Sequence, residues 1–115
     1  MIQNITLTDQ QTTEVCDILR WVLVQSPLQP HIQLPVGTSI QAWVFGSRAT
    51  GRARPYSDLD ILISSPTPLD WRARADLQDA FEASNLPFRV DVVEESRLAP
   101  ALTPRVLSER QYLPI

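Results

Sequence analysis

The chain has 115 residues, a hydrophobic fraction of 43% and a formal net charge of -3. This length and composition predict a single folded domain over residues 1–115 and exclude a chain that is disordered throughout. The acidic balance argues against strong binding to duplex nucleic acid, because such binding depends on many cations that neutralise phosphates. All ten basic residues are arginine, whose planar fork suits carboxylate and phosphate oxygens.

Cysteine content and hydropathy both bear on location. Cys16 is the only cysteine, so no internal disulfide can form, and a lone thiol suits a reducing compartment. No uninterrupted apolar segment reaches the roughly 18 residues that a membrane span needs. The N-terminus also lacks a basic start followed by an apolar stretch. We therefore expect a cytoplasmic protein without a membrane span.

The first predicted element is a helix over residues 8–25. Thr8 and Gln11 have the spacing of a capping box. Apolar residues then recur at helical intervals and are expected to face the core: Val15, Ile18, Leu19, Val22 and Leu23. Three prolines predict a connecting loop over residues 26–35, in which His31 is expected at the surface, because no second histidine or nearby cysteine is there to share a metal.

The rest of the chain predicts a small mixed β-sheet flanked by helices, an α/β (α+β) fold. β-Branched, aromatic and alternating apolar residues predict strands over residues 39–45, 58–64 and 88–93, and helical patterns cover residues 70–85 and 104–110. Asp70 is the expected N-cap of the longer of these two helices. Trp21 and Trp43 are expected to pack in the core, whereas Trp71 is expected at the surface.

Two aspartates one residue apart open the second predicted strand. Side chains alternate along a strand, so Asp58 and Asp60 point to one face, with their Cα atoms roughly 7 Å apart, and apolar side chains point to the other. By the same rule Asp91 lies on the polar face of the third strand. If these two strands pair with their acidic faces aligned, three carboxylates meet in an oxygen-rich site of the kind that Mg²⁺ prefers.

The loop before these aspartates adds phosphate-binding candidates. Gly46 permits an unusual turn, and Ser47 can begin a helical turn whose backbone N–H groups and hydroxyl face a phosphate. The arginines that follow are candidates to contact a triphosphate: Arg48, Arg52 and Arg54. A carboxylate cluster beside such a loop suits nucleotidyl transfer with two metal ions about 4 Å apart. Each feature alone is also common as a helix cap, a turn or a solvated surface residue.

The conjunction of these residues resembles the minimal nucleotidyltransferases of the DNA polymerase beta-like nucleotidyltransferase superfamily. The motif of that family, G-S-x-A-x-G followed by S-D-x-D, is present as Gly46, Ser47, Ala49, Gly51, Ser57, Asp58 and Asp60. The resemblance implies that Asp58, Asp60 and Asp91 hold two Mg²⁺ ions and catalyse the reaction. It implies that Gly46 and Ser47 bind the phosphates of ATP, with Arg48 and Ser57 as further nucleotide-binding candidates.

Small proteins of this family often act as antitoxins beside a HEPN-domain ribonuclease toxin. The resemblance therefore implies transfer of AMP from ATP to a tyrosine hydroxyl of such a partner. One alternative is a non-catalytic module that neutralises its partner by covering it. Another is a nucleotidyltransferase that acts on a small molecule or on an RNA end.

Overall fold

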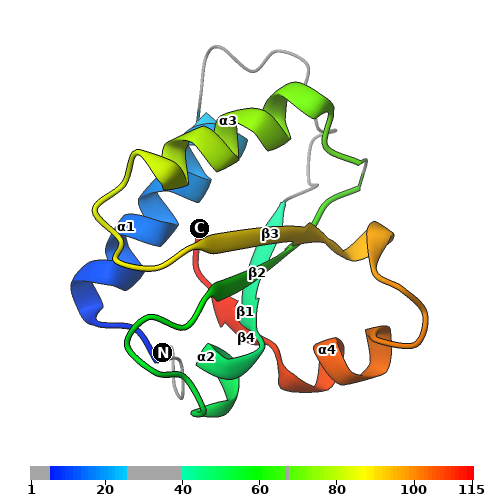
Figure 1. Ribbon diagram of the computed structural model, residues 1–115. Coiled ribbons are helices and arrows are strands. Elements are labelled where there is room, and N and C mark those ends of the chain that lie inside the picture. The colour runs from blue at the N-terminus through cyan, green and yellow to red at the C-terminus, as the bar shows by residue number, and fades with distance from the viewer. Residues whose placement is uncertain (1–5, 26–39, 67) are drawn as a thin grey trace.

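A four-stranded mixed sheet forms the centre of the molecule (Figure 1). The structure is a computed structural model that describes residues 6–25, 40–66 and 68–115. The strand order is β3-β2-β1-β4. The strands are β1 (Gln41–Phe45), β2 (Leu59–Ser64), β3 (Val90–Glu94) and β4 (Gln111–Leu113). The predicted fold class, a small mixed sheet flanked by helices, is confirmed.

The connections explain why the sheet is mixed. β1 runs antiparallel to both β2 and β4, whereas β2 and β3 are parallel. A parallel pair needs a crossover, and α3 (Trp71–Glu82) provides it. Asp70 caps this helix as expected, because its side chain accepts a hydrogen bond from the backbone N–H of Ala73.

Two helices cover one face of the sheet. α1 (Asp9–Arg20) begins with the predicted capping box and continues as a π-helical turn, η1 (Trp21–Gln25). Together they confirm the predicted helix over 8–25. α1 and α3 lie side by side on this face (Figure 1). Between them and the strands lies the apolar core, which includes Val15, Leu19, Val44, Leu59, Ile61, Ile63, Leu77 and Phe81.

The opposite face of the sheet is covered only in part. Short elements follow β3, a 3-10 turn η2 (Glu95–Arg97) and α4 (Thr103–Glu109), before the chain enters β4. The predicted helix over 104–110 is thus confirmed to within a residue, but β4 was not expected, because three residues carry too little periodicity to indicate a strand. Val106 of α4 is buried without joining the main core.

Three tryptophan predictions have different outcomes. Trp71 is exposed as expected. The core prediction for Trp21 is wrong, since this side chain is 56% exposed and its neighbours Val22 and Leu23 fill the apolar stripe instead. Trp43 does not join the core as predicted: it is half-buried on the partly covered face, where the Arg110 guanidinium lies 4.1 Å from its ring centroid.

Two further predictions concern the proline-rich loop over residues 26–35 and the absence of a membrane span. The proline-rich loop and His31 lie outside the described residues. Within the described ranges, no helix combines the length and the apolar character that crossing a bilayer requires.

Candidate active site

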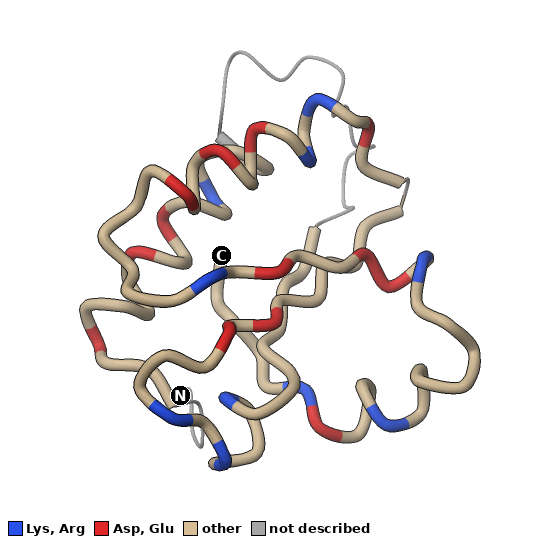
Figure 2. Tube along the Cα trace, viewed as in Figure 1, with Lys and Arg blue, Asp and Glu red and all other residues tan. Residues whose placement is uncertain are grey.

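The pairing of β2 with β3 sets the predicted aspartates beside each other. In this parallel register Asp60 is the direct partner of Asp91. Leu59, Ile61 and Ile63 of β2 are buried in the core, so Asp60 points to the opposite, partly covered face. Figure 2 shows the acidic positions of these strands next to each other at the centre of the fold. The expected alignment of the two acidic strand faces is therefore present.

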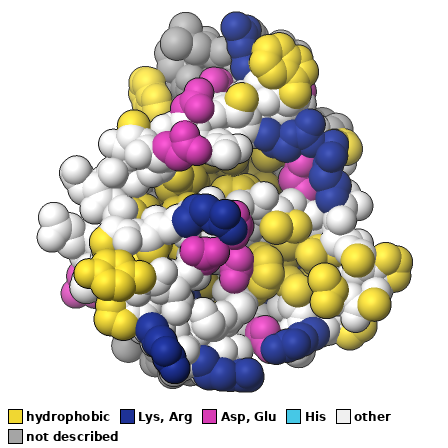
Figure 3. All heavy atoms as spheres, viewed as in Figure 1, with side chains coloured by type: hydrophobic (Ala, Val, Ile, Leu, Met, Phe, Trp, Pro, Cys, Tyr) yellow, Lys and Arg dark blue, Asp and Glu magenta, His cyan; other side chains and the backbone are white. Residues whose placement is uncertain are grey.

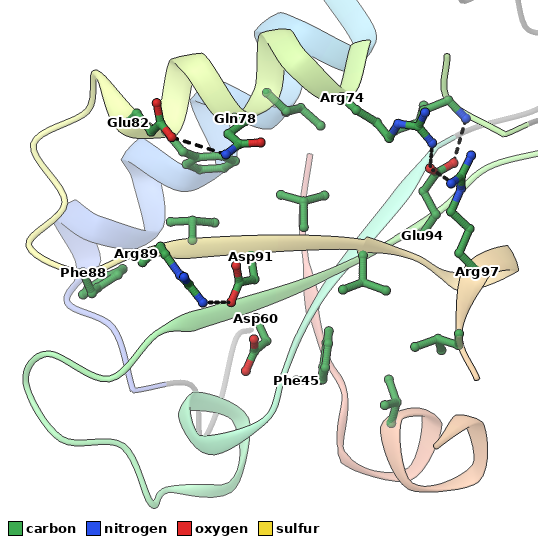
Figure 4. Close-up of a pocket in the computed structure, with 18 of the residues that line it drawn as sticks. Phe45, Asp60, Arg74, Gln78, Glu82, Phe88, Arg89, Asp91, Glu94 and Arg97 are labelled. Atoms are coloured by element: carbon green, nitrogen blue, oxygen red, sulfur yellow. Dashed lines mark hydrogen bonds and ion pairs between the residues drawn. The ribbon is translucent and has the colours of Figure 1, made fainter. Parts of the chain in front are cut away.

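Asp58 joins this pair through an arginine. It immediately precedes β2, and its Oδ2 accepts a hydrogen bond of 3.2 Å from Nη2 of Arg89. The same nitrogen donates to Oδ2 of Asp91 at 3.1 Å. One guanidinium group thus lies between two of the three predicted carboxylates. Figure 4 shows Arg89 reaching Asp91 above Asp60.

The electrostatics of the cluster are most evident at Asp60. The pKa of this carboxyl is raised to about 6, first by burial and then by the neighbouring charges of Asp91 and Asp58. Arg89 acts in the opposite direction on the pKa of Asp60 but does not offset these effects. The acids around Asp60 therefore outweigh the single arginine in their effect on its pKa, and with a pKa of about 6 Asp60 itself is mostly ionised at neutral pH.

The donor chemistry of the cluster fits a divalent cation. Carboxylate oxygens are the ligands that Mg²⁺ and Mn²⁺ prefer, and three formal negative charges face one arginine. Over the described ranges, however, no three acidic, histidine or cysteine side chains are already arranged to hold one ion. Asp58 and Asp91 are turned toward Arg89 instead, so a metal ion would need a small rearrangement of these side chains.

Gly46 brings the preceding loop directly against Asp60. Its φ of +75° lies in a region that favours glycine, and it caps the four-residue helix α2 (Ser47–Thr50). A Cβ atom at this position would collide with Oδ2 of Asp60. Gly46 is thus held against the Asp60 carboxylate, and Ser47 follows it as the first residue of α2.

Arg48 has a different place from the one predicted. It is only 3% exposed and donates hydrogen bonds to the backbone carbonyls of Thr6, Pro55 and Ser57. Its guanidinium also lies 3.9 Å from the ring centroid of Phe88. The prediction that Arg48 contacts phosphate therefore needs correction: this side chain ties the loop before Asp58 to the body of the protein.

Ser57 contributes to the same loop closure. Its hydroxyl accepts a hydrogen bond of 2.8 Å from the backbone N–H of Arg54, and its carbonyl accepts from Arg48. These bonds fix the backbone immediately before Asp58. Arg52 and Arg54 are exposed on the loop.

A cleft of about 890 Å³ opens beside the carboxylates. Asp60 and Asp91 line one part of it together with Phe45 of β1 and Val106 of α4. Figure 3 shows the hollowed face, with acidic side chains and a basic one at its centre and apolar side chains around them. The cleft thus combines an apolar wall, suited to a ring or an alkyl surface, with a charged centre.

The far end of the cleft contains a buried acid that sequence reasoning missed. Glu94 is 5% exposed, accepts the backbone N–H of Leu69 at 2.7 Å and forms ion pairs with Arg74 and Arg97. Figure 4 shows these arginines converging on Glu94 from α3 and η2. This cluster links the start of α3 to the end of β3. Glu94, Arg74 and Arg97 lie in three different elements, so no pattern within one segment of the sequence predicts that they form a cluster.

Strand alternation places Arg89 on the polar face with Asp91, but the sequence did not indicate that Arg89 joins the carboxylate cluster. Arg89 precedes Asp91 by two residues, so strand alternation places both on the same face. The bridge to Asp58 depends on strand pairing, which alternation does not determine.

The sequence matches a protein-family model over most of its length and a curated relative over less than half of it. The sequence model of the nucleotidyltransferase domain matches residues 33–113. A protein of Haemophilus influenzae named "Probable protein adenylyltransferase MntA" is 54% identical over 52 residues, which are 45% of this chain and 46% of that protein. The chain thus spans about half the length of this curated relative.

Solved structures show the same fold. A structure described as that of a proposed minimal nucleotidyltransferase has 31% identity and a TM-score of 0.58, with 92% of this chain and 90% of that chain covered. A crystal structure of a toxin-antitoxin with AMP-PNP has a TM-score of 0.63 at 24% identity, over 89% of this chain and 71% of that chain. An MntA-HepT toxin-antitoxin crystal structure has a TM-score of 0.57 at 20% identity, over 92% and 71%.

Proposed function

The chain belongs to the nucleotidyltransferase domain family, and from this premise we propose that it transfers AMP from ATP to a hydroxyl group of a partner protein. The family match confirms the resemblance drawn from the motif around Gly46 and Asp60. The single observation that carries the proposal is the register of β2 and β3, which pairs Asp60 with Asp91 beside the cleft.

The proposed metal site consists of Asp58, Asp60 and Asp91. Two Mg²⁺ ions held there would supply positive charge for the phosphates and for the attacking and leaving oxygens. Asp60, with a pKa of about 6, is charged at neutral pH and so available as a ligand. Gly46 and Ser47 are proposed to bind the phosphates, because the Gly46 backbone lies against the Asp60 carboxylate.

The proposed reaction is a displacement at the α-phosphorus of ATP. The acceptor oxygen forms a new bond to this phosphorus, and the bond to the bridging oxygen of pyrophosphate breaks. Asp91 is proposed to take the proton of the acceptor hydroxyl, since a carboxylate beside the reacting atoms can serve as a general base. Arg48 takes no part in these steps but positions the loop that precedes Asp58.

The proposed acceptor is a tyrosine of a HEPN-type toxin, for which the chain would act as antitoxin. The adenylyltransferase relative and the toxin-antitoxin structures with the same fold support this choice. A cleft that is open on one side also leaves room for a segment of a protein acceptor. With ATP and a ribonuclease toxin as its substrates, the protein is proposed to act in the cytoplasm as a single domain.

The test is label transfer from α-labelled ATP, with Mg²⁺, to a purified HEPN-type toxin offered as the acceptor. We expect label on a tyrosine of the partner, catalytic turnover, and loss of both in an Asp58→Asn, Asp60→Asn double variant. Asp79→Asn, an exposed acid of α3 outside the cleft, is the matched control.

Two results would contradict the proposal. Stoichiometric neutralisation of the partner by the double variant without nucleotide would indicate occlusion. Label found only in a small-molecule or RNA fraction would indicate a different acceptor.

A further inference from the structure

Arg89 bridges the carboxylate cluster in a way that differs from a stable arginine-carboxylate pair. A strong pair uses two nitrogens of the guanidinium on the two oxygens of one carboxylate. Here a single nitrogen, Nη2, donates to one oxygen of Asp58 at 3.2 Å and to one oxygen of Asp91 at 3.1 Å. This arrangement resembles a cation shared by two acids rather than a fork engaged with one.

The Arg89 side chain is also highly exposed to solvent. It is 72% exposed, belongs to the residue just before β3 and lines the cleft. Ion pairs at such exposure are weak, because water and salt compete for both partners. Arg48 provides the contrast within the same site, since it is buried and bonded to several carbonyls.

The cluster nevertheless needs a counter-charge when no metal is bound. Three carboxylates lie on or beside two paired strands, and like charges this close destabilise the fold. Among the residues that the structure describes, Arg89 is the arginine that forms ion pairs with two of them, Asp58 and Asp91. Without Arg89, Asp58 and Asp91 would lose this basic partner, and the repulsion among the three acids would increase.

We infer that Arg89 is an internal counter-ion that takes the position of a divalent cation between Asp58 and Asp91, and that metal binding displaces it. The inference rests on the metal site proposed above. It makes metal binding a competition: the ion must replace a guanidinium that already partly neutralises the acids. The metal-free site is thereby kept stable, at the cost of a lower affinity for free metal.

The experiment is a Mn²⁺ titration of the full chain without nucleotide, followed by electron paramagnetic resonance. We expect Arg89→Gln to bind Mn²⁺ about three- to tenfold more tightly than the native protein, as expected for the loss of two exposed ion pairs. Arg89→Lys keeps the charge and should stay close to the native affinity. Arg72→Gln, an exposed arginine of α3 outside the cleft, should leave the affinity unchanged.

Thermal unfolding gives a second readout. In a chelator, Arg89→Gln should unfold at a lower temperature than the native protein, because the acids repel one another. Saturating Mn²⁺ should remove this difference, since a bound ion stabilises the folded state by mass action.

Failure of this inference is distinguishable from failure of the proposed function. If the native protein binds Mn²⁺, Asp60→Asn does not, and Arg89→Gln binds no more tightly than the native protein, then the counter-ion role is wrong and the metal site stands. If the native protein binds no Mn²⁺ at millimolar concentration even with a non-hydrolysable ATP analogue, both are wrong.

Discussion

Ile61 and Asp60 are neighbours in β2, but they face environments of opposite character. Ile61 is fully buried between the sheet and the helices, in a core that apolar side chains close completely. Asp60 points to the other face, where acidic side chains lie close together beside an open cleft. One face of the sheet thus provides stability, and the other holds acidic side chains whose mutual repulsion Arg89 offsets only in part.

The largest effect is expected at the acidic face. Asp60→Asn should reduce the rate of AMP transfer by about a thousandfold, because stabilisation of transferred phosphate by a metal ion amounts to several kcal/mol. The rate is measured with saturating ATP and Mg²⁺, and Asp79→Asn is the control. Transfer by Asp60→Asn at more than about a tenth of the native rate would show that this face does not carry the chemistry.

Substitutions on the helix-covered face should instead lower the free energy of unfolding. Ile61→Ala removes a fully buried side chain and should lower the free energy of unfolding by about 3 kcal/mol, measured by urea denaturation. Ile61→Val should cost only about 1 kcal/mol. The transfer rate per folded molecule should change little in either variant. If folded Ile61→Val protein had a much lower transfer rate than the native protein, the assignment of stability to one face and of activity to the other would be wrong.

Alanine variants of the two motif glycines, Gly46 and Gly51, distinguish the effect of backbone strain from the effect of contact with Asp60. Both have positive φ, but a Cβ at Gly46 would collide with Asp60, whereas Gly51 faces open space. Gly51→Ala should lower the free energy of unfolding by about 1 kcal/mol and leave transfer intact. Gly46→Ala should lower it by about 2 kcal/mol and also impair transfer. Equal effects of the two variants on transfer would show that the contact with Asp60 is unimportant.

The smallest expected effect is an increase in the free energy of unfolding of the metal-free protein when Asp60 is replaced by asparagine. The pKa of Asp60 in the folded protein, about 6, exceeds its ordinary value of 3.8, so the folded state binds more protons between these values. Stability should therefore decrease as pH rises from about 4 to about 6 and remain reduced above that range. Asp60→Asn should abolish this dependence and raise stability at pH 7 by about 1 kcal/mol, after allowance for solvent screening.

Thermal unfolding in a chelator at pH 4 and pH 7 measures this effect. A shift of about 4 °C at pH 7 is expected for a domain of this size. An Asp60→Asn variant that is less stable than the native protein at pH 7 would mean that the charged carboxylate is favourable in the fold.

The two faces also differ in how well the sequence predicts them. Alternation in β2 and helical spacing in α1 correctly assigned Leu59, Ile61 and Leu19 to the core, because burial repeats with the period of each element. The motif likewise located Asp58, Asp60 and Gly46 in one place. Local pattern and short-range chemistry were sufficient for these residues.

Residues whose role depends on strand order or long-range pairing were not predictable. Arg48 occupies an unspecified position within the motif, and its burial against Phe88 and Thr6 follows from tertiary packing. Glu94 is held by arginines from two other elements. β4 is only three residues long, and its pairing with β1 depends on where α4 ends. No periodicity within one segment carries this information.

The most direct test of the carboxylate site is a crystal structure of the protein with Mn²⁺ and a non-hydrolysable ATP analogue. The account predicts anomalous difference density for Mn²⁺ in contact with Asp58 and Asp60 oxygens, with Asp91 directed at the same site and Arg89 withdrawn from Asp58. Manganese bound elsewhere, or a triphosphate seated away from Gly46 and Ser47, would contradict it.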